Sequence, residues 1–561
     1  MTERTTRPAT SPSTTTDEPT TVADAIAAAE PTDARPLAGL LARLDARGLV
    51  RGARRDDLPI GVGGVGDVRI RGVAEDSRAV RDGTLFVAVP GFHVDGAEYV
   101  VPAAEAGAAA ALVEQAVPGT HLPQVVVRGA RPALAEAAAW WYRDPSRRVG
   151  VIGITGTDGK TTTSFLAVAA LEAAGLSTGL VGTVETKVGS VRERHEAHVT
   201  TPGAPELQAT LAAMAQAGNE VAVLETTSHA LALDRVAGVA YDAAIFTNLT
   251  HEHLDLHGSF EAYRAAKLRL FASLAAGDGN PPKTVGARPW PKLAVINRDD
   301  PAAAWFEATA REAGARIVTY GATETADVRA TAVEEDAHRL RVRYAAPSGE
   351  ASLDLRLAGR FNVHNALAVV ALGDGLGLDA QAIRAGLEGV EGVPGRMERI
   401  DQGQPFGVIV DYAHSPASLA AVLELLAPLA AARGGGLVAV FGSAGERDTA
   451  KRAQMGRIAG ERARLVVATD EDPRGEDRDA IVDEIVRGAE AAGRHRGVDA
   501  LAIPDRRTAI EAAFERARPG DVVLLAGKGH EQTILYADHA LPWDEAGVAR
   551  ETLRAMGWTG D

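Results

Sequence analysis

A glycine-rich segment with one lysine, Thr155-Gly-Thr-Asp-Gly-Lys-Thr-Thr162, follows a short apolar run and precedes a predicted helix over residues 161–174. Glycines let backbone N–H groups approach phosphate oxygens, and the helix N-terminus adds a positive partial charge. In this pattern Lys160 meets the β- and γ-phosphates of a nucleotide, and the Thr161 hydroxyl meets Mg²⁺. The strict P-loop pattern fails, because Ile154 occupies the position of its first glycine. A connector without a ligand is the alternative, which the strand before and the helix after the segment disfavour.

A second glycine-rich segment, Gly61-Val-Gly-Gly-Val-Gly66, matches the dinucleotide fingerprint G-x-G-x-x-G. That fingerprint requires a strand before it and a helix after it. Here it follows the polar stretch Arg54-Arg-Asp-Asp57, and no clear helix pattern opens behind it. We therefore predict a flexible turn at this segment and no nucleotide site.

Residues suited to metal chemistry follow two of the apolar runs. Glu225 ends the run Val221-Ala-Val-Leu224, where a carboxylate can reach a metal across a nucleotide crevice. The spacing His251-x-His253-x-x-x-His257 permits a zinc site.

Lysine is rare, with seven residues among the 59 lysines and arginines. Arginine is thus the default cation, and a retained lysine suggests chemistry that needs a compact ammonium or a deprotonated amine. Lys267 lies in the predicted helix around Tyr263-Arg-Ala-Ala-Lys-Leu-Arg-Leu-Phe271. Its alternative role is a solvated side chain on an amphipathic helix. Chance retention suits Lys187, Lys283 and Lys292.

Composition limits the class of protein. A chain of 561 residues, 46% hydrophobic and 24% charged, predicts about three globular domains. The net charge of −16 argues against a nucleic-acid surface, and the absence of cysteine excludes disulfides and thiolate metal sites. No apolar run reaches the ~18 residues of a spanning helix. We expect a soluble cytoplasmic protein that inserts into no membrane and binds no nucleic acid.

Strand and helix patterns divide the chain into four segments. Residues 1–36 are rich in Thr, Pro and Ser and predict a disordered tail. Residues 37–147 predict a small α/β unit. Residues 148–392 alternate strands with helices, which predicts a doubly wound central domain with an antiparallel ribbon over about residues 328–357. Residues 393–561 predict a third α/β unit, whose strands run into polar loops of the kind that carry ligands.

The loop Gly-Thr-Asp-Gly-Lys-Thr resembles the phosphate loop of the Mur ligase family, and other landmarks follow in that family's order after about residue 70. The resemblance implies an ATP-dependent ligase with an N-terminal UDP-binding unit, a central P-loop ATPase domain and a Rossmann-like C-terminal domain. It assigns the ATP phosphates to Gly156, Thr157, Asp158, Gly159, Lys160, Thr161 and Thr162.

Other segments resemble the branch of that family that joins a diamino acid to a muramoyl dipeptide. Asp76-Ser-Arg78 and Pro90-Gly-Phe-His-Val-Asp-Gly96 imply that Ser77 and His93 contact UDP, although simple turn chemistry is an alternative for both. Many relatives have Ser-Ser where this chain has Thr227-Ser228. The residues implied to contact the dipeptide and Mg²⁺ are Thr200, Thr201, Thr227 and Arg235.

The resemblance also implies a metal set. The run from Thr247 to His257 is similar to the family's loop in which the residue matching His253 meets a second Mg²⁺, which favours magnesium over zinc. Lys267 matches a lysine that CO₂ converts to a carbamate, an anionic metal ligand that arginine cannot replace. The implied metal ligands are Thr161, Glu225, His253 and carbamylated Lys267, and Lys160 completes the catalytic group.

Four further residues, in stretches that resemble the surroundings of the nucleotide and the domain junction, are Asn297, Asn365, Arg396 and Asp411. The third unit is implied to select the incoming amino acid. Arginine suits its carboxylate, and acidic side chains suit its ammonium groups. The implied residues are Arg447, Glu471, Asp472, Pro473, Arg474, Gly527 and Glu531.

One motif departs from the family pattern. The branch that uses meso-diaminopimelate typically reads Asp-Asn-Pro-Arg, whereas this chain reads Glu471-Asp-Pro-Arg474. The added charge of Asp472 favours the cationic end of lysine or ornithine, and Arg474 favours a distal carboxylate. We place diaminopimelate slightly ahead.

The mechanism implied by the resemblance begins when a side-chain carboxylate of the dipeptide attacks the γ-phosphate of ATP. The amine of the diamino acid then attacks the resulting acyl phosphate. Three alternatives remain: the ligase that adds D-Ala-D-Ala, a folate polyglutamate ligase, and a regulatory P-loop ATPase that forms no product. We expect a monomer whose partners are small-molecule substrates.

Overall fold

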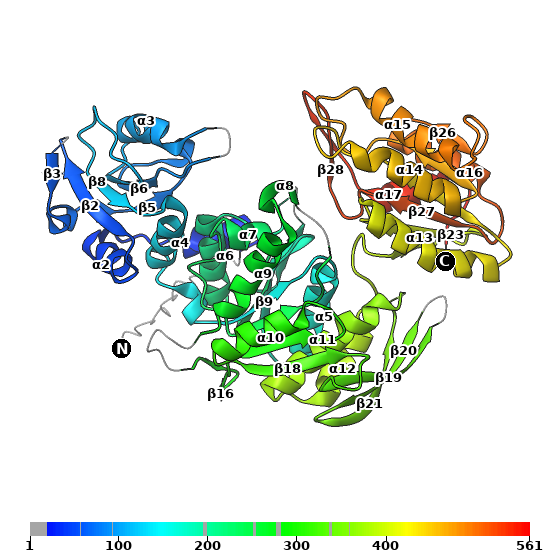
Figure 1. Cartoon of the computed structure of the whole chain (residues 1–561), viewed down its shortest axis with the longest axis horizontal. Coiled ribbons are helices and arrows are strands. Elements are labelled where there is room, and N and C mark those ends of the chain that lie inside the picture. Colours follow the sequence, from blue (N-terminus) through cyan, green and yellow to red (C-terminus); the bar gives the residue numbers. More distant parts are fainter. Residues whose placement is uncertain are drawn as a thin grey trace, which may run out of the picture.

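The computed structural model describes residues 19–56, 58–91, 94–194, 199–250, 254–275, 282–335, 339–357 and 359–560. Three regions of the chain each build a β-sheet covered by helices, and the first and third regions lie on opposite sides of the second (Figure 1). The predicted α/β fold with three domains is confirmed.

The N-terminal domain is built on six strands in the order β3-β2-β8-β7-β6-β5. Strands β5 to β8 are parallel, and β2 pairs antiparallel with β8. The rejected dinucleotide fingerprint forms a short 3₁₀ turn, η1 (Val62–Val65). The elements are α2 (Ala38–Ala46), β2 (Val50–Arg55), β3 (Leu58–Ile60), β5 (Gly72–Ala74), β6 (Thr84–Val87), α3 (Val100–Glu105), β7 (Ala110–Val113), β8 (Gln124–Val127) and α4 (Ala130–Trp141), and β1 (Arg35–Pro36) pairs with β4 (Arg69–Ile70).

The central domain has an 11-stranded sheet in the order β12-β11-β10-β13-β9-β14-β17-β18-β19-β20-β21. Seven neighbouring strands from β10 to β19 are parallel, and an antiparallel ribbon extends each edge. The predicted ribbon over residues 328–357 is β19 to β21. The strands are β9 (Gly150–Thr155), β10 (Thr178–Val181), β11 (Glu185–Val188), β12 (Val191–Arg194), β13 (Val221–Glu225), β14 (Ala243–Phe246), β17 (Leu293–Asn297), β18 (Arg316–Gly321), β19 (Val328–Glu335), β20 (Leu340–Ala346) and β21 (Gly349–Leu355).

Helices cover both faces of the central sheet, because nearly continuous apolar strands such as β9 must be buried on both sides. One hydrophobic core joins the sheet to α5, α11 and α12, and the opposite core joins it to α6, α7, α9 and α10. The helices are α5 (Lys160–Ala173), α6 (Ala204–Gln216), α7 (Ser228–Ala232), α8 (Leu254–His257), α9 (Phe260–Ala272), α10 (Ala303–Glu312), α11 (Phe361–Leu376) and α12 (Ala380–Gly389), and β15 (Thr284–Val285) pairs with β16 (Arg288–Pro289).

The C-terminal domain has six strands in the order β22-β23-β27-β24-β25-β26, all parallel except β22. Helices α13 to α15 pack on one face, and α16 and α17 pack on the other. The elements are β22 (Glu398–Ile400), β23 (Gly407–Asp411), α13 (Pro416–Ala432), β24 (Leu437–Phe441), α14 (Ala450–Arg462), β25 (Leu465–Ala468), α15 (Arg478–Ala491), β26 (Ala500–Ala502), α16 (Arg506–Arg516), β27 (Val522–Ala526), β28 (Thr533–Leu535), β29 (Ala540–Pro542) and α17 (Glu545–Ala555).

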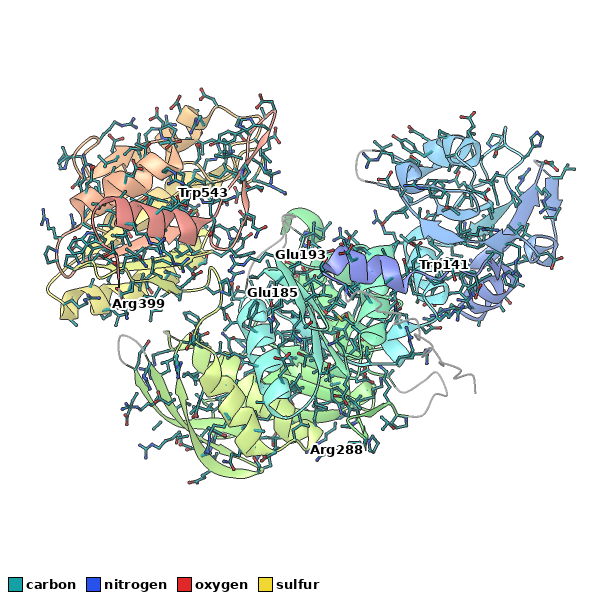
Figure 2. The ribbon with its side chains drawn as sticks, turned by 180° about the vertical axis from the view of Figure 1, so that it is seen from behind. Trp141, Glu185, Glu193, Arg288, Arg399 and Trp543 are labelled. Carbon is teal, nitrogen blue, oxygen red and sulfur yellow. The ribbon has the colours of Figure 1, made fainter. Side chains whose placement is uncertain are left out.

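The prediction of a disordered tail up to residue 36 is wrong for its last part, because α1 (Val22–Ala29) is an ordered helix. Thr21 and Asp24 form a capping box, and Val22 and Ala25 are buried in the core that contains α6. The Val22 backbone N–H donates to Glu193 of β12 (2.9 Å), which Figure 2 labels beside this helix. The composition of residues 1–36 is dominated by Thr, Pro and Ser, so a short alanine-rich helix within it was not predicted. Such a short helix becomes stable by packing on the central domain.

No helix in the described ranges is both long and apolar enough to cross a bilayer.

Candidate nucleotide and substrate site

The phosphate loop connects β9 to α5 at the carboxyl edge of the central sheet, as predicted. Two of its glycines cannot carry a side chain. A Cβ on Gly156 would lie 1.8 Å from Thr247 Oγ1, and a Cβ on Gly159 would lie 2.5 Å from Asn365 Oδ1. Gly159 also has a φ of +83°, which L side chains rarely adopt. The loop therefore brings backbone N–H groups to the start of α5 with no Cβ in the way.

Lys160 folds back over this loop. Its Nζ donates to the carbonyl oxygens of Gly156 (3.0 Å) and Thr157 (2.7 Å), and the side chain is half-buried. Asp158 is exposed, and its backbone N–H donates to Asn248 Oδ1 (2.9 Å). The ammonium thus lies on the loop that is predicted to hold the phosphates.

Glu225 is fully buried at the end of β13 and collects hydroxyl donors from two neighbouring elements. Thr161 Oγ1 donates to its Oε2 (2.9 Å), and so does Thr183 Oγ1 (2.8 Å). The Thr183 backbone N–H donates to Oε1 (3.0 Å). Sequence reasoning missed Thr183. It follows β10, which neighbours β13, so its place at the carboxyl edge of the sheet is the signal that could have identified it.

The residues predicted to contact the dipeptide lie directly beside this cluster. Thr183 and Thr200 share a hydrogen bond between their hydroxyls (3.1 Å). Thr201 Oγ1 donates to the carbonyl oxygen of Glu225 (2.8 Å). The hydroxyls of Thr201 and Thr227 lie 3.2 Å apart, and an Arg235 guanidinium N–H donates to the Thr201 carbonyl oxygen (3.0 Å). Side chains from segments far apart in sequence therefore form one polar network.

Lys267 is buried at 1% exposure, so its interpretation as a solvated helix residue is wrong. Its Nζ donates to the Gly156 carbonyl oxygen (2.6 Å) and lies 4.5 Å from the centre of the Tyr263 ring. The Tyr263 hydroxyl in turn lies 3.0 Å from Thr157 Oγ1. Lys267 and Lys160 thus approach the same phosphate loop from different helices.

The histidine run is only partly described. His251 and His253 lie outside the described residues, whereas the His257 ring contacts the rings of Tyr263 and His229 at centroid distances of 5.3 and 5.8 Å. Within the described part of the chain, no group of three or more His, Cys, Asp and Glu residues is arranged to hold a metal ion. The oxygen donors of Thr161, Thr183 and Glu225 nevertheless suit a hard cation such as Mg²⁺.

Two residues predicted to contact the nucleotide form hydrogen bonds next to the phosphate loop. Asn365 Oδ1 accepts from Thr163 Oγ1 (3.3 Å), and Asn297 Nδ2 donates to the Thr247 carbonyl oxygen (2.6 Å). Thr162, also predicted here, is buried in the first turn of α5.

The other two predicted nucleotide contacts lie at the entrance to the C-terminal domain. Asp411 accepts from the backbone N–H groups of Met397 and Ala413 (both 2.8 Å), and burial raises the pKa of its carboxyl group. The Arg396 guanidinium stacks 4.5 Å from the centre of the Tyr412 ring.

His530 connects the C-terminal domain to the cluster around Glu225. Its ring faces the backbone of Thr183 across the domain boundary, and its Nδ1 has no hydrogen-bond partner among the described residues. Burial lowers the pKa of His530 to about 3, with a further contribution from the positive charge of Arg396. Sequence reasoning singled out the neighbouring Glu531 and not His530. The imidazole is neutral at physiological pH, as its place beside an arginine requires.

The motif at residues 471–474 follows β25 and meets a fully buried lysine from the loop after β27. Lys528 Nζ pairs with Asp472 (2.8 Å) and Glu531 (2.6 Å), and Asp472 Oδ1 also accepts from the Leu535 backbone N–H (2.9 Å). Lys528 is therefore shared between the two carboxylates of Asp472 and Glu531, and the idea that Asp472 favours a cationic substrate stays a prediction.

Several buried polar atoms beside this pair have no hydrogen-bond partner among the described residues, namely Ser443 Oγ, Glu471 Oε2 and Arg474 Nε. A Cβ on Gly527 would lie 3.3 Å from Glu471 Oε2. Pro473 is buried, and Arg474 has a left-handed φ of +53°. Unpaired donors and acceptors at a strained loop are typical of a ligand site. Arg447 lies exposed on the neighbouring loop.

The motif Asp76-Ser77-Arg78 forms a turn in the N-terminal domain. Asp76 accepts from the Arg78 backbone N–H (2.9 Å), and the Arg78 side-chain hydrogen bond lowers the pKa of Asp76 to about 2. Turn chemistry therefore accounts for Asp76 and Arg78, and the role of Ser77 stays a prediction. His93 lies outside the described residues.

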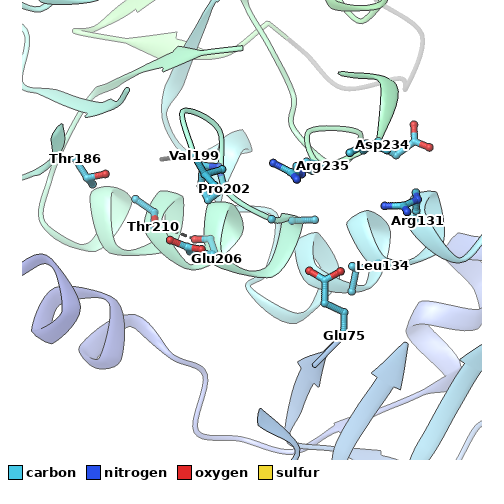
Figure 3. Close-up of a pocket in the computed structure, with 13 residues that line it drawn as sticks. Glu75, Arg131, Leu134, Thr186, Val199, Pro202, Glu206, Thr210, Asp234 and Arg235 are labelled. Carbon is cyan, nitrogen blue, oxygen red and sulfur yellow. Dashed lines mark hydrogen bonds between the residues drawn. The ribbon is translucent and has the colours of Figure 1, made fainter. Parts of the chain in front are cut away.

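A cavity of about 330 Å³ lies between the N-terminal and central domains (Figure 3). Arg235 lines it, so the polar network around Glu225 continues into the cavity. Its charged lining residues are Glu75, Arg131, Glu206, Asp234 and Arg235.

Comparison with known proteins finds relatives over most of the chain. Residues 69–148 match the model for the Mur ligase family catalytic domain, 154–373 that for the Mur ligase middle domain, and 395–529 that for the Mur ligase glutamate ligase domain. A UDP-N-acetylmuramyl-tripeptide synthetase from Roseiflexus sp. (strain RS-1) is 49% identical over 88% of this chain and 96% of its own length. A UDP-N-acetylmuramoyl-L-alanyl-D-glutamate--2,6-diaminopimelate ligase from Streptomyces coelicolor is 41% identical over 87% of this chain and 93% of its own.

A solved structure of a UDP-N-acetylmuramoyl-L-alanyl-D-glutamate--2,6-diaminopimelate ligase matches with a TM-score of 0.59 and 28% identity. The match covers 88% of this chain and 97% of that one. These matches place the chain among ATP-dependent ligases. The chain belongs to the Mur ligase family.

Proposed function

We propose that the enzyme uses ATP to join a diamino acid to UDP-N-acetylmuramoyl-L-alanyl-D-glutamate, a step of peptidoglycan precursor synthesis. The observation that carries this proposal is the continuous polar network from the phosphate loop through Thr161, Glu225 and Thr201 to Arg235 at the cavity. A nucleotide on the loop and a carboxylate substrate in the cavity would meet along this network.

In the proposed reaction, an oxygen of the D-Glu side-chain carboxylate attacks the γ-phosphorus of ATP, and the bond to ADP breaks. The amine nitrogen of the diamino acid then attacks the carbonyl carbon of the acyl phosphate, loses a proton and displaces phosphate. Lys160 would stabilise the charge on the transferred phosphoryl group. Water must be excluded from the acyl phosphate, which assigns a closing role to the C-terminal domain.

Thr161 and Glu225 would hold Mg²⁺, which supplies positive charge to the phosphate oxygens when bound. His253 remains a proposed ligand from a segment outside the described residues. We also propose that Lys267 is carbamylated. Its amine is buried beside the phosphate loop, where an added carboxylate would give the site an anionic oxygen ligand that an ammonium cannot provide.

For the amine we favour meso-diaminopimelate, with lysine or ornithine as the alternatives. Asp472 shares Lys528 with Glu531, so its charge is only partly offset, and lysine and ornithine stay as alternatives. Arg474, with a buried Nε that has no partner among the described residues, would bind a distal carboxylate, and Glu471 would bind an ammonium. The names of the relatives support both readings, since some are tripeptide synthetases and others diaminopimelate ligases.

The test is a panel of amines offered to the purified enzyme with ATP and the UDP-muramoyl dipeptide. We expect ADP release only when both dipeptide and amine are present, with diaminopimelate used best. ADP release that needs neither substrate would indicate a regulatory ATPase and contradict the proposal. Preference for lysine or ornithine would overturn only the choice of amine. Use of folate or D-Ala-D-Ala substrates in place of the panel would indicate another ligase of this fold.

A further inference from the structure

Glu75 lines the cavity between the N-terminal and central domains. It follows β5, and its side chain points from the N-terminal domain toward the central domain (Figure 3). Within the described ranges its carboxylate makes no hydrogen bond and no ion pair. A Cβ on Gly203 would lie 3.1 Å from Glu75 Oε1, so the carboxylate lies close to the backbone directly before α6.

The charges around Glu75 are mixed. Partial burial between two domains raises the pKa of Glu75, and the negative charge of Asp76 raises it further. The positive charges of Arg235 and Arg131 lower it. The side chain itself is open to the cavity. The remaining charged groups at this cavity are Glu206 and Asp234. Arg131 and Arg235 supply N–H donors suited to carboxylates, whereas Glu75 can only accept when it is ionised.

An acceptor that the protein leaves unpaired in a substrate cavity is suited to a donor on the ligand. The UDP-muramoyl dipeptide offers amide N–H groups and sugar hydroxyls in addition to its carboxylates. A carboxylate at Glu75 would bind such a donor and repel a misplaced anionic group, so it would fix the orientation of the ligand in two ways.

We propose that Glu75 is a specificity-determining residue, which accepts a hydrogen bond from an N–H or O–H group of the muramoyl dipeptide portion of the substrate. This inference rests on the proposed function. It assigns the charged groups of the cavity to different groups of the ligand: Arg131 and Arg235 to carboxylates, and Glu75 to a donor.

The experiment is calorimetric binding of UDP-N-acetylmuramoyl-L-alanyl-D-glutamate to the full-length enzyme and to Glu75→Ala, Glu75→Leu and Glu75→Gln. The Ala and Leu variants should raise Kd roughly tenfold or more, since a hydrogen bond to a charged group is lost. The Gln variant should stay within about threefold, because its Oε1 still accepts. UDP alone, which lacks the muramoyl and peptide donors, should bind all four proteins equally.

Glu105→Ala, which removes an exposed carboxylate of α3 in the same domain, is the matched control and should bind like the wild type. Equal affinity of Glu75→Ala and wild type would overturn the inference. A Gln variant that binds the UDP-muramoyl dipeptide as weakly as the Ala variant would also overturn the inference. That result would indicate that the charge of Glu75 matters through attraction between the domains and that Glu75 accepts no hydrogen bond from the ligand. A wild-type enzyme that fails to bind the UDP-muramoyl dipeptide would instead contradict the proposed function. Thermal denaturation of each variant checks that it is folded.

Discussion

Lys160 contacts its own loop in the structure, and this contact has a consequence for catalysis. The ammonium donates to two loop carbonyls, so it is already positioned where the phosphates of ATP are expected. We predict that Lys160→Ala lowers kcat by about a thousandfold, because the charge on the transferred phosphoryl group loses its nearest cation. ADP release coupled to ligation measures this loss. Near-normal turnover of a folded variant would show that the phosphate assignment is wrong.

The proposed carbamylation of the buried Lys267 can be tested by substitution. Lys267→Ala should lose most activity, because a carbamate ligand cannot form, and millimolar formate or acetate should restore part of it. Lys267→Arg is the matched control, since it keeps a cation, fills the space and should not be rescued. Turnover is measured with and without the added acid. Full activity of the Ala variant in the absence of acid would count against carbamylation.

Three of the seven lysines lie outside the predicted site and make structural contacts. Chance retention does not describe Lys187, Lys283 or Lys292. Lys187 pairs with Glu172 (2.7 Å), and both Lys283 (2.5 Å) and Lys292 (3.1 Å) pair with the buried Asp242. Each also donates to at least one backbone carbonyl. These three lysines are therefore buried or partly buried and hold structural ion pairs, so rarity alone does not identify a catalytic lysine.

Among the elements, α1 makes the clearest prediction. It packs on α6 and the β11–β12 ribbon, and these elements flank the segment that carries Thr200 and Thr201. Ala25→Asp places a carboxylate in the buried contact and should destabilise the enzyme by about 1–3 kcal/mol. It should also raise KM for the UDP-muramoyl dipeptide severalfold with KM for ATP unchanged.

The matched control is Ala27→Asp, which makes the same change on the exposed side of α1. Thermal denaturation and steady-state kinetics measure both effects. If Ala25→Asp and Ala27→Asp behave alike, α1 has no positioning role.

The elements that sequence predicts are those with a local pattern. The strand, glycines and helix around Lys160 define the phosphate loop, and Glu225 follows a continuous apolar strand, so both could be located without a structure. Thr183 belongs to no motif and joins the cluster only because β10 lies beside β13 in the sheet. The Asp472–Lys528 pair joins residues far apart in sequence, so this contact depends on tertiary packing and could not be predicted.

At the scale of the whole molecule, the C-terminal domain contacts the central domain through His530. Its pKa is lowered to about 3, first by burial, whereas an unfolded histidine titrates near 6.5. A depressed folded pKa means that stability is fully present above about pH 6.5 and is lost as pH falls toward 3. Lowering the pH from 7 to 5 should therefore cost up to about 2 kcal/mol through this residue.

The measurement compares thermal denaturation of the wild type and His530→Gln at both pH values. The wild type should lose several degrees more than the variant, which lacks the titrating group. Equal losses in the two proteins would show that His530 is not protonated on unfolding in this range, and the proposed contact would need revision.

In the proposed reaction, a carboxylate in the cavity attacks the γ-phosphate of ATP held on the loop at residues 156–160. The most direct measurement labels the D-Glu side-chain carboxylate of the UDP-muramoyl dipeptide with ¹⁸O and analyses the phosphate released by ligation. We predict one ¹⁸O atom in each phosphate, because the attacking oxygen stays on phosphorus when the amine displaces the phosphate. Phosphate without the label, formed during normal ligation, would contradict an acyl phosphate and the arrangement of the site proposed from it.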